Sequence, residues 1–175
     1  KSGTKRRIKK IVLGMLFRNA RIMLCIGEEN KKFYEYYGVP SKKLIMCRYA
    51  VDNERIVHAV EESRKERKAT REKMGIQEDD VVVLFVGKLI EKKNPLDALI
   101  AYAQIQNKNK ALIIVGEGEL RTAIEQYVKE YKVPNVHCTG FKNQTELPLY
   151  YACADIFVLP SGSGEPWGLV VNEAM

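Results

Sequence analysis

Residues 81–115 read VVVLFVGKLIEKKNPLDALIAYAQIQNKNKALIIV, and they decide the fold. The apolar runs at 81–86 and 111–115 are continuous, as is typical of strands buried on both faces of a sheet. Between them, Pro95 opens an amphipathic segment that predicts a helix as far as Gln106. A strand, a helix and a second strand in this order predict two strands of a parallel sheet.

The same alternation continues to the end of the chain. It predicts further elements at 119–131 (helix), 135–139 (strand), 145–152 (short helix), 155–159 (strand) and from near Gly168 (helix). Four strands, each followed by a helix, predict an α/β fold with a Rossmann-like parallel sheet flanked by helices. Ligands of such sheets bind beyond the carboxyl ends of the strands. A loop with glycine or a cation leaves each strand there, at 87–88, 116–118, 140–143 and 160–168.

The last loop, within PSGSGEPWGLVVNEAM (160–175), precedes the start of a helix. Free backbone amides and the positive end of the helix dipole at that start predict a binding site for a diphosphate. Glu165 lies just before the site. Glu173 lies one helical turn beyond it, where a carboxylate can accept hydrogen bonds from two ribose hydroxyls. The amides belong to Gly168, Leu169 and Val170.

The spacing Glu-x7-Glu is by itself weak evidence, because two further pairs share it. Glu54 with Glu62 and Glu117 with Glu125 lie in charged stretches typical of solvated helix faces. The pair at 165 and 173 alone straddles a loop that follows a buried strand. Its context favours a ligand site.

Five motifs together resemble the retaining glycosyltransferases of family 4, which have two Rossmann-like domains and the GT-B fold. Their order and spacing match that family. The motifs are VGKLIEKKNPLDALIAY (86–102), LIIVGEGELR (112–121), VHCTGF (136–141), YYACADIFVLPS (150–161) and EPWGLVVNEAM (165–175).

The resemblance implies roles for the cations and for one loop. Lys88 and Lys93 match residues that neutralise the donor diphosphate, although the family more often has arginine at the first position. Lysine keeps the charge without the planar fork. Asn94 stands where the family usually has glycine. Phe141 and Lys142 match the loop whose backbone meets the nucleobase.

The resemblance also implies the roles of the two carboxylates and the reaction. Glu173 matches the ribose-binding residue, and Glu165 matches the residue that faces the donor sugar and phosphate and is associated with catalysis. The implied reaction transfers a sugar from a UDP- or GDP-sugar to a glycan or lipid-linked acceptor, with retention of configuration. We interpret Gly116 and Gly118 first as turn residues, because GEGELR lacks the third glycine of a dinucleotide fingerprint.

No metal site and no cofactor are expected. The sequence has no Asp-x-Asp motif to hold a divalent cation, and its two histidines, His58 and His137, are far apart. The lysines and the helix amides would then stabilise the departing nucleoside diphosphate.

The first fifty residues differ from the rest and resemble the end of the family's N-terminal domain. They predict a strand at 20–26, a helix at 28–38, a short strand at 44–46 and a linker at 48–53, followed by a charged helix at 54–74. We therefore divide the chain into residues 1–49, the end of an acceptor domain, and 50–175, a donor-binding domain. The chain has no initiating methionine and stops at Met175 within a helix, so we expect a fragment that is inactive alone.

The net charge of +7 is concentrated at the start of the chain. Residues 1–10 hold six Lys/Arg and no acid, which leaves 23 basic against 22 acidic residues elsewhere. The apolar run within residues 1–24 is shorter than the roughly 20 residues of a membrane span. Two interpretations stay open: a basic amphipathic helix on an anionic membrane surface, or a helix that packs on its own domain.

Composition and cysteine use favour an intracellular enzyme. Hydrophobic residues make up 46% of the chain, and we find no secretion signal. The four cysteines, Cys25, Cys47, Cys138 and Cys153, show no metal or CxxC spacing, so we expect reduced core residues. We predict a cytoplasmic protein, with peripheral contact to the inner face of the membrane if the first helix binds lipid.

Two other classes of function remain as alternatives. A sugar-nucleotide enzyme such as an epimerase could share this architecture, because a fold does not fix a reaction. A nucleic-acid-binding module is disfavoured, because the excess charge lies in ten residues without interleaved aromatics. We therefore expect no nucleic-acid partner.

Overall fold

The computed structural model describes residues 3–47, 50–162, 165 and 167–175. The chain forms two compact units, residues 1–50 and 51–175, and each is described by itself. The boundary lies in the expected linker, of which Arg48 and Tyr49 lie outside the described residues. The assignment of the two parts as acceptor and donor domains stays a prediction.

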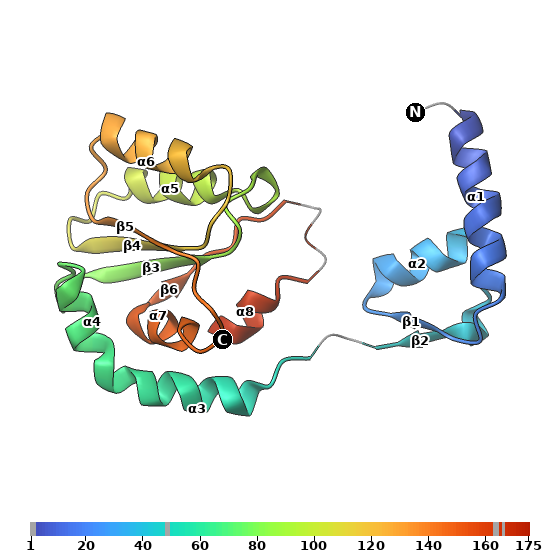
Figure 1. Ribbon diagram of the computed structural model, residues 1–175, viewed down its shortest axis with the longest axis horizontal. Helices are drawn as coiled ribbons and strands as arrows, with labels where there is room; N and C mark the ends of the chain where they lie inside the picture. Colours follow the sequence, from blue (N-terminus) through green and yellow to red (C-terminus); the bar gives the residue numbers. More distant parts are fainter. Residues whose placement is uncertain (1–2, 48–49, 163–164, 166) are drawn as a thin grey trace. The chain divides into compact units, whose positions relative to one another are not determined.

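The second unit is a parallel sheet between two layers of helices (Figure 1). Its strands run in the order β5-β4-β3-β6, and every neighbouring pair is parallel. The predicted α/β fold is confirmed. The elements are α3 (Asn53–Ser63), η2 (Arg64–Glu66), α4 (Arg67–Lys73), β3 (Val81–Val86), η3 (Glu91–Lys93), α5 (Pro95–Gln104), β4 (Lys110–Val115), α6 (Arg121–Glu130), β5 (Val136–Gly140), α7 (Leu147–Cys153), β6 (Ile156–Phe157) and α8 (Leu169–Ala174).

The two central strands, β3 and β4, carry both hydrophobic cores. Alternate side chains of β3 enter opposite cores: Phe85 packs with Leu99 and Ile124 under α5 and α6. Leu84 packs with Cys153 on the other face, which Figure 1 shows covered by α3, α4, α7 and α8. Burial on both faces explains why these strands read as continuous apolar runs.

A partly buried ionic network connects α4 to the amino end of the sheet. Arg71, whose side chain is 4% exposed, donates to Asp155 Oδ2 at 2.7 Å and to Cys153 O at 2.8 Å. Arg67 donates to Asp155 Oδ1 at 2.8 Å, and Val82 N donates to Asp155 Oδ2 at 2.8 Å. Burial raises the pKa of Asp155, but these hydrogen bonds outweigh it and hold the pKa below its ordinary value.

The prediction of one continuous helix at 54–74 is wrong. The segment is divided into α3 and α4 by the 3-10 turn η2. Ser63 Oγ donates to Ala59 O at 2.8 Å, a bond of the kind that bends helices. The bend accompanies the contacts of both halves with α7.

The strand predicted at 155–159 is shorter than expected. β6 comprises only Ile156–Phe157, although Asp155 N and Val158 N still donate to Val82 O and Leu84 O, each at 2.9 Å. Pro160, which has no N–H, then ends any pairing. The chain leaves the sheet early and enters the loop that precedes α8.

The first unit contains a two-stranded parallel sheet with helices. Phe17 of α1 contacts Phe33, Tyr34 and Tyr37, with ring centroids 5.3–6.3 Å apart. The strand predicted at 20–26 is confirmed in its central part, and the helix at 28–38 ends two residues early. The elements are α1 (Gly3–Arg18), β1 (Met23–Cys25), α2 (Glu28–Tyr36), η1 (Ser41–Lys43) and β2 (Leu44–Met46).

All four cysteines are free thiols, as expected. Cys25 and Cys153 are buried, and Cys138 is half-buried. The prediction of a core position is wrong for Cys47, which is exposed directly after the end of β2.

Candidate functional site

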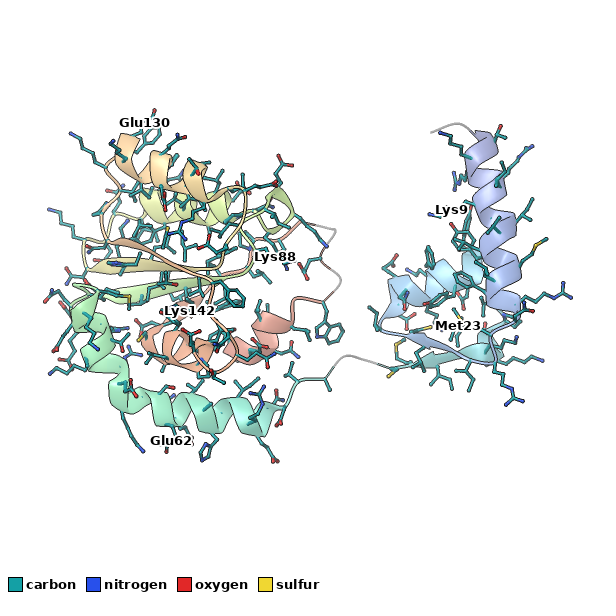
Figure 2. The ribbon with its side chains drawn as sticks, in the orientation of Figure 1. Lys9, Met23, Glu62, Lys88, Glu130 and Lys142 are labelled. Atoms are coloured by element: carbon teal, nitrogen blue, oxygen red, sulfur yellow. The ribbon has the colours of Figure 1, made fainter. Side chains whose placement is uncertain are left out.

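The carboxyl ends of β3 and β4 and the residues after β5 enclose a cavity of about 400 Å³. The cavity brings together three predicted site residues: Lys88, Phe141 and Lys142. Figure 2 labels the two lysines near this end of the sheet. Leu147 of α7 closes one side of the cavity. The other lining residues are Val86, Gly87, Val115, Gly116 and Glu117.

Glycine is required where the loops after β3 and β4 meet. Gly116 has φ +144°, and a Cβ there would lie 1.9 Å from Gly87 O. A Cβ on Gly118 would lie 2.3 Å from Leu89 O. Glycine at both positions therefore allows a close approach of the two backbones. Leu89 N donates to Glu117 O at 2.9 Å and joins the two loops.

The loop after β5 presents an aromatic ring and a cation. Phe141 is 72% exposed, which is unusual for a phenylalanine next to a cavity, and it offers a face on which a planar base could stack. Lys142 lies 3.4 Å from Glu146 and 5.7 Å from the ring centroid of Tyr150. A hydrogen bond with Tyr150 raises the pKa of Lys142, which therefore carries its charge at neutral pH.

Lys93 and Glu165 form an ion pair between the loop after β3 and the loop after β6. Their side chains are only 19% and 18% exposed. Glu165 Oε1 also accepts a hydrogen bond from Gly168 N at 3.1 Å. The hydrogen bond from Lys93 lowers the pKa of Glu165 most, against the opposing effect of burial. Lys93, which we predict to bind the diphosphate, is thus paired with Glu165, the carboxylate that we predict to be catalytic.

Asn94 follows Lys93 and adopts a left-handed conformation, with φ +49° and ψ +46°. Glycine adopts this conformation readily and asparagine tolerates it, so the substitution relative to the family leaves the local turn intact. Asn94 Nδ2 donates to Pro160 O at 2.9 Å. Reasoning from the sequence missed this bond, which joins residues 66 positions apart.

Glu173 on α8 accepts a hydrogen bond from the hydroxyl of Tyr151 on α7, at 2.9 Å. Burial raises the pKa of Tyr151, so the phenol stays protonated and donates. Arg55 and Gln144 line a small cavity of about 20 Å³ beside this pair. Reasoning from the sequence missed this partner of Glu173, because nothing in the sequence distinguishes Tyr151 from the adjacent Tyr150.

The prediction that a helix begins near Gly168 is confirmed. The helix is α8, and its first residue is Leu169. Gly168 has φ +67°, and its amide donates the hydrogen bond that Glu165 accepts. One of the three amides predicted for the diphosphate is therefore bound to a carboxylate. Val170 packs against the core below the sheet, whereas the side chain of Leu169 is exposed.

All the predicted site residues except Leu169 and Val170 fall into three groups. Lys88, Phe141 and Lys142 share the cavity; Lys93, Glu165 and Gly168 share hydrogen bonds; Glu173 bonds to Tyr151. Of the remaining Glu-x7-Glu pairs, Glu54 and Glu62 lie on the exposed face of α3, as expected. The expectation of a helix face is wrong for Glu117, which lies in the loop after β4 and lines the cavity. Arg121 pairs with Glu117 and with Glu125, the latter at 2.9 Å.

Metal ligands do not gather in the part of the chain that the structure describes. Within it, no three His, Cys, Asp or Glu side chains are placed to hold one ion. His58 is exposed on α3, and His137 lies on β5, where burial lowers its pKa. Metal independence stays a prediction.

Comparison with protein families gives one match, over residues 66–175, to the family described as glycosyl transferases group 1. An uncharacterized glycosyltransferase of Methanocaldococcus jannaschii is 36% identical over 107 residues, which are 60% of this chain and 27% of that protein. An alpha-monoglucosyldiacylglycerol synthase of Acholeplasma laidlawii is 28% identical over 110 residues, 61% of this chain and 27% of that one. The matched part of the chain thus spans about a quarter of the length of these relatives.

Solved structures share the architecture. The crystal structure of Anabaena HepE in complex with UDP and glucose superposes with a TM-score of 0.74 at 19% identity. The superposition covers 99% of this chain and 46% of the Anabaena chain. At this identity the likeness shows the fold: α/β, with a parallel sheet flanked by helices.

Proposed function

The chain belongs to the glycosyl transferases of group 1, and on that premise we propose that its second unit binds a UDP- or GDP-sugar for transfer to a glycan or lipid-linked acceptor. One observation carries the proposal. The cavity that holds Lys88, Phe141 and Lys142 opens at the carboxyl ends of parallel strands, where such sheets bind nucleotides.

In the proposed complex the base occupies the cavity and the diphosphate lies toward the cations. Phe141 contributes an exposed ring beside the space for the base. Lys88 and Lys93 neutralise the phosphates as point charges. The amides of Leu169 and Val170 add hydrogen-bond donors, and that of Gly168 joins them once it is released from Glu165. Glu173, held by Tyr151, accepts from the ribose hydroxyls.

Glu165 is the residue that we assign to the chemistry. During transfer the bond from the sugar C1 to the diphosphate oxygen breaks, C1 bonds to the acceptor oxygen, and the proton of the acceptor hydroxyl passes to the leaving diphosphate. Negative charge accumulates on the leaving diphosphate, and fixed cations stabilise it. When the donor binds, Lys93 leaves its ion pair with Glu165 and pairs with a phosphate. The carboxylate of Glu165 is then available beside the sugar. We assign retention and metal independence by the family resemblance, and no cofactor is needed.

The names of relatives guide the choice of substrates. The Anabaena structure contains UDP, and the Acholeplasma relative is named for the synthesis of a glucosylated diacylglycerol. We therefore favour a UDP-sugar donor and a lipid or glycan acceptor for this chain.

We also propose contact of α1 with an anionic membrane surface, for a cytoplasmic protein held peripherally. Within the first unit, α1 exposes an apolar stripe of Ile8, Ile11, Val12, Met15 and Leu16, each 49–66% exposed. Its first half carries five cations, which suits anionic headgroups. No helix in the described part of the chain is long and apolar enough to cross a bilayer.

Flotation with vesicles tests the membrane proposal. The protein should float with phosphatidylglycerol vesicles and remain at the bottom with purely zwitterionic ones. Replacing Lys5, Arg6 and Lys9 by glutamine should abolish the difference, and identical partitioning of both proteins would overturn the proposal.

Nucleotide binding tests the donor site. We expect ligand-observed NMR with UDP, GDP, ADP and NAD to show binding of UDP or GDP, and loss of that binding in Glu173→Ala. A folded protein that binds none of the four would overturn the proposed function.

A further inference from the structure

Three consecutive residues after β3 hold the loop that follows β6. Lys92 O accepts from Gly162 N at 3.2 Å, and Lys93 pairs with Glu165. The third residue, Asn94, donates from its side-chain amide to Pro160 O. The first contact uses only backbone atoms, and the second uses the predicted site residues themselves. Of the three contacts, only the hydrogen bond from Asn94 is made by a side chain to which we assign no contact with the sugar donor.

We propose that Asn94 is a positioning residue of the donor site, whose side-chain amide fixes the loop after β6 so that Lys93 and Glu165 face each other. The inference rests on the proposed function of that pair. Glycine at position 94 would supply the left-handed backbone equally well. What asparagine adds is the Nδ2 donor, and this chain therefore gains a fastening that a glycine cannot provide.

The fastening has a consequence for the charge on Glu165. The carboxyl faces Lys93 and Gly168 N, and the charge of Lys92 adds to them. All three lower its pKa, and burial alone opposes them. If the bond to Pro160 is lost and the loop shifts, the hydrogen bond from Lys93 weakens first. The pKa of Glu165 should then rise toward its ordinary value.

Asn135 provides a matched control. It also adopts a left-handed conformation, with φ +53°, and its Nδ2 donates to Lys110 O at 3.1 Å. It lies immediately before β5, at the opposite end of the sheet from the cavity. Asn135→Gly therefore removes the same kind of bond from a residue with the same left-handed backbone, away from the site.

The first measurement needs no nucleotide. The side-chain carboxyl of Glu165 is titrated by carbon-detected NMR in the wild type, Asn94→Gly and Asn135→Gly. We expect its midpoint to move to higher pH in Asn94→Gly and to stay in place in Asn135→Gly. An unchanged midpoint in Asn94→Gly would overturn the inference. A shift in a protein that binds no nucleotide would show that Asn94 positions Lys93 against Glu165, and would overturn the proposed function together with the donor-site role of Asn94.

The second measurement is the Kd for UDP and GDP by calorimetry, together with Tm. We expect Asn94→Gly to weaken binding by roughly three- to tenfold, because a misplaced cation loses much of its effect on a fixed phosphate. Asn94→Asp keeps the size of the side chain but sets an oxygen against Pro160 O, so it should bind at least as weakly. Asn135→Gly should lower Tm with wild-type affinity. A variant at position 94 that lowers Tm and keeps wild-type Kd would show a merely structural role.

Discussion

The hydroxyl of Tyr151 donates to Glu173 Oε2 at 2.9 Å and so links the end of α7 to α8. The two residues are 22 positions apart, and the bond is half-buried. Because the pKa of Tyr151 is raised, the donor stays protonated throughout the pH range in which proteins are stable. The bond therefore orients the carboxylate that we assign to the ribose.

Replacing Tyr151 by phenylalanine should weaken nucleotide binding without unfolding the protein. The loss of one hydrogen bond to a charged group corresponds to about 1.5–3 kcal/mol, or roughly 10- to 150-fold in Kd if the orientation is lost entirely. Calorimetric titration with UDP and GDP measures the change. Tyr131→Phe, on an exposed tyrosine beyond α6, should keep wild-type affinity, and equal Kd values in all three proteins would count against the role of Tyr151.

Glu165→Gln should separate turnover from binding. The glutamine keeps the shape but releases Lys93 from its ion pair, so nucleotide affinity should stay the same or increase, while kcat falls by about 100-fold or more. Steady-state kinetics and Kd measurements on the full-length enzyme check both expectations. Glu62→Gln, from another pair with the same spacing, should behave as wild type. Wild-type kcat in Glu165→Gln would exclude a catalytic role.

Gly116→Ala should destabilise the second unit strongly. The new Cβ would meet Gly87 O at 1.9 Å in a backbone conformation that alanine avoids, so we expect a loss of about 3 kcal/mol or more in the free energy of unfolding. Urea denaturation followed by circular dichroism measures it. In Gly87→Ala the Cβ makes an ordinary contact at 3.4 Å, so that variant should change stability by no more than about 1 kcal/mol. Similar losses in both would contradict the packing argument.

Asp155→Asn should remove an acid-sensitive part of the stability. The pKa of Asp155 is lower in the folded chain than in the unfolded one, so its contribution is present above the unfolded value of about 4 and disappears as the pH falls through the folded value. At pH 7 we expect a loss of about 1–3 kcal/mol, reduced from that of a fully buried pair because the carboxylate is 36% exposed.

Urea denaturation at a series of pH values checks this expectation. The difference between wild type and Asp155→Asn should shrink as the pH falls below about 4. Asp79→Asn, at an exposed aspartate, should show a small difference at every pH. A difference for Asp155→Asn that does not depend on pH would mean that packing, and not charge, is lost.

The central strands and their helices could be predicted from the sequence because their patterns are local. β3 and β4 are buried on both faces, and that burial is written in unbroken apolar runs. The break between α3 and α4 could not be predicted. It accompanies a bond from Ser63 to the previous turn and the reach of Arg71 to Asp155, a contact over 84 positions.

The site divides in the same way. The meeting of Lys88 with Phe141 and Lys142 follows from parallel strands, whose carboxyl ends share one edge. The pairing of Lys93 with Glu165, 72 positions apart, depends on how two irregular loops pack, and residue types alone do not encode it. The exposure of Cys47 is likewise set by the end of a short strand and not by its apolar neighbours.

The close contact of Gly116 with Gly87, and of Gly118 with Leu89, makes the three loops around the cavity unequal as sites of change. The first two loops leave no space for a side chain at their contact, whereas Phe141 in the third is exposed. Directed evolution of donor preference should therefore yield folded variants when positions 141 and 142 are randomised, and mostly insoluble protein when 116 and 118 are. Of these three loops, the one that carries Phe141 and Lys142 is therefore the one in which substitutions can change the preferred sugar donor without loss of the fold.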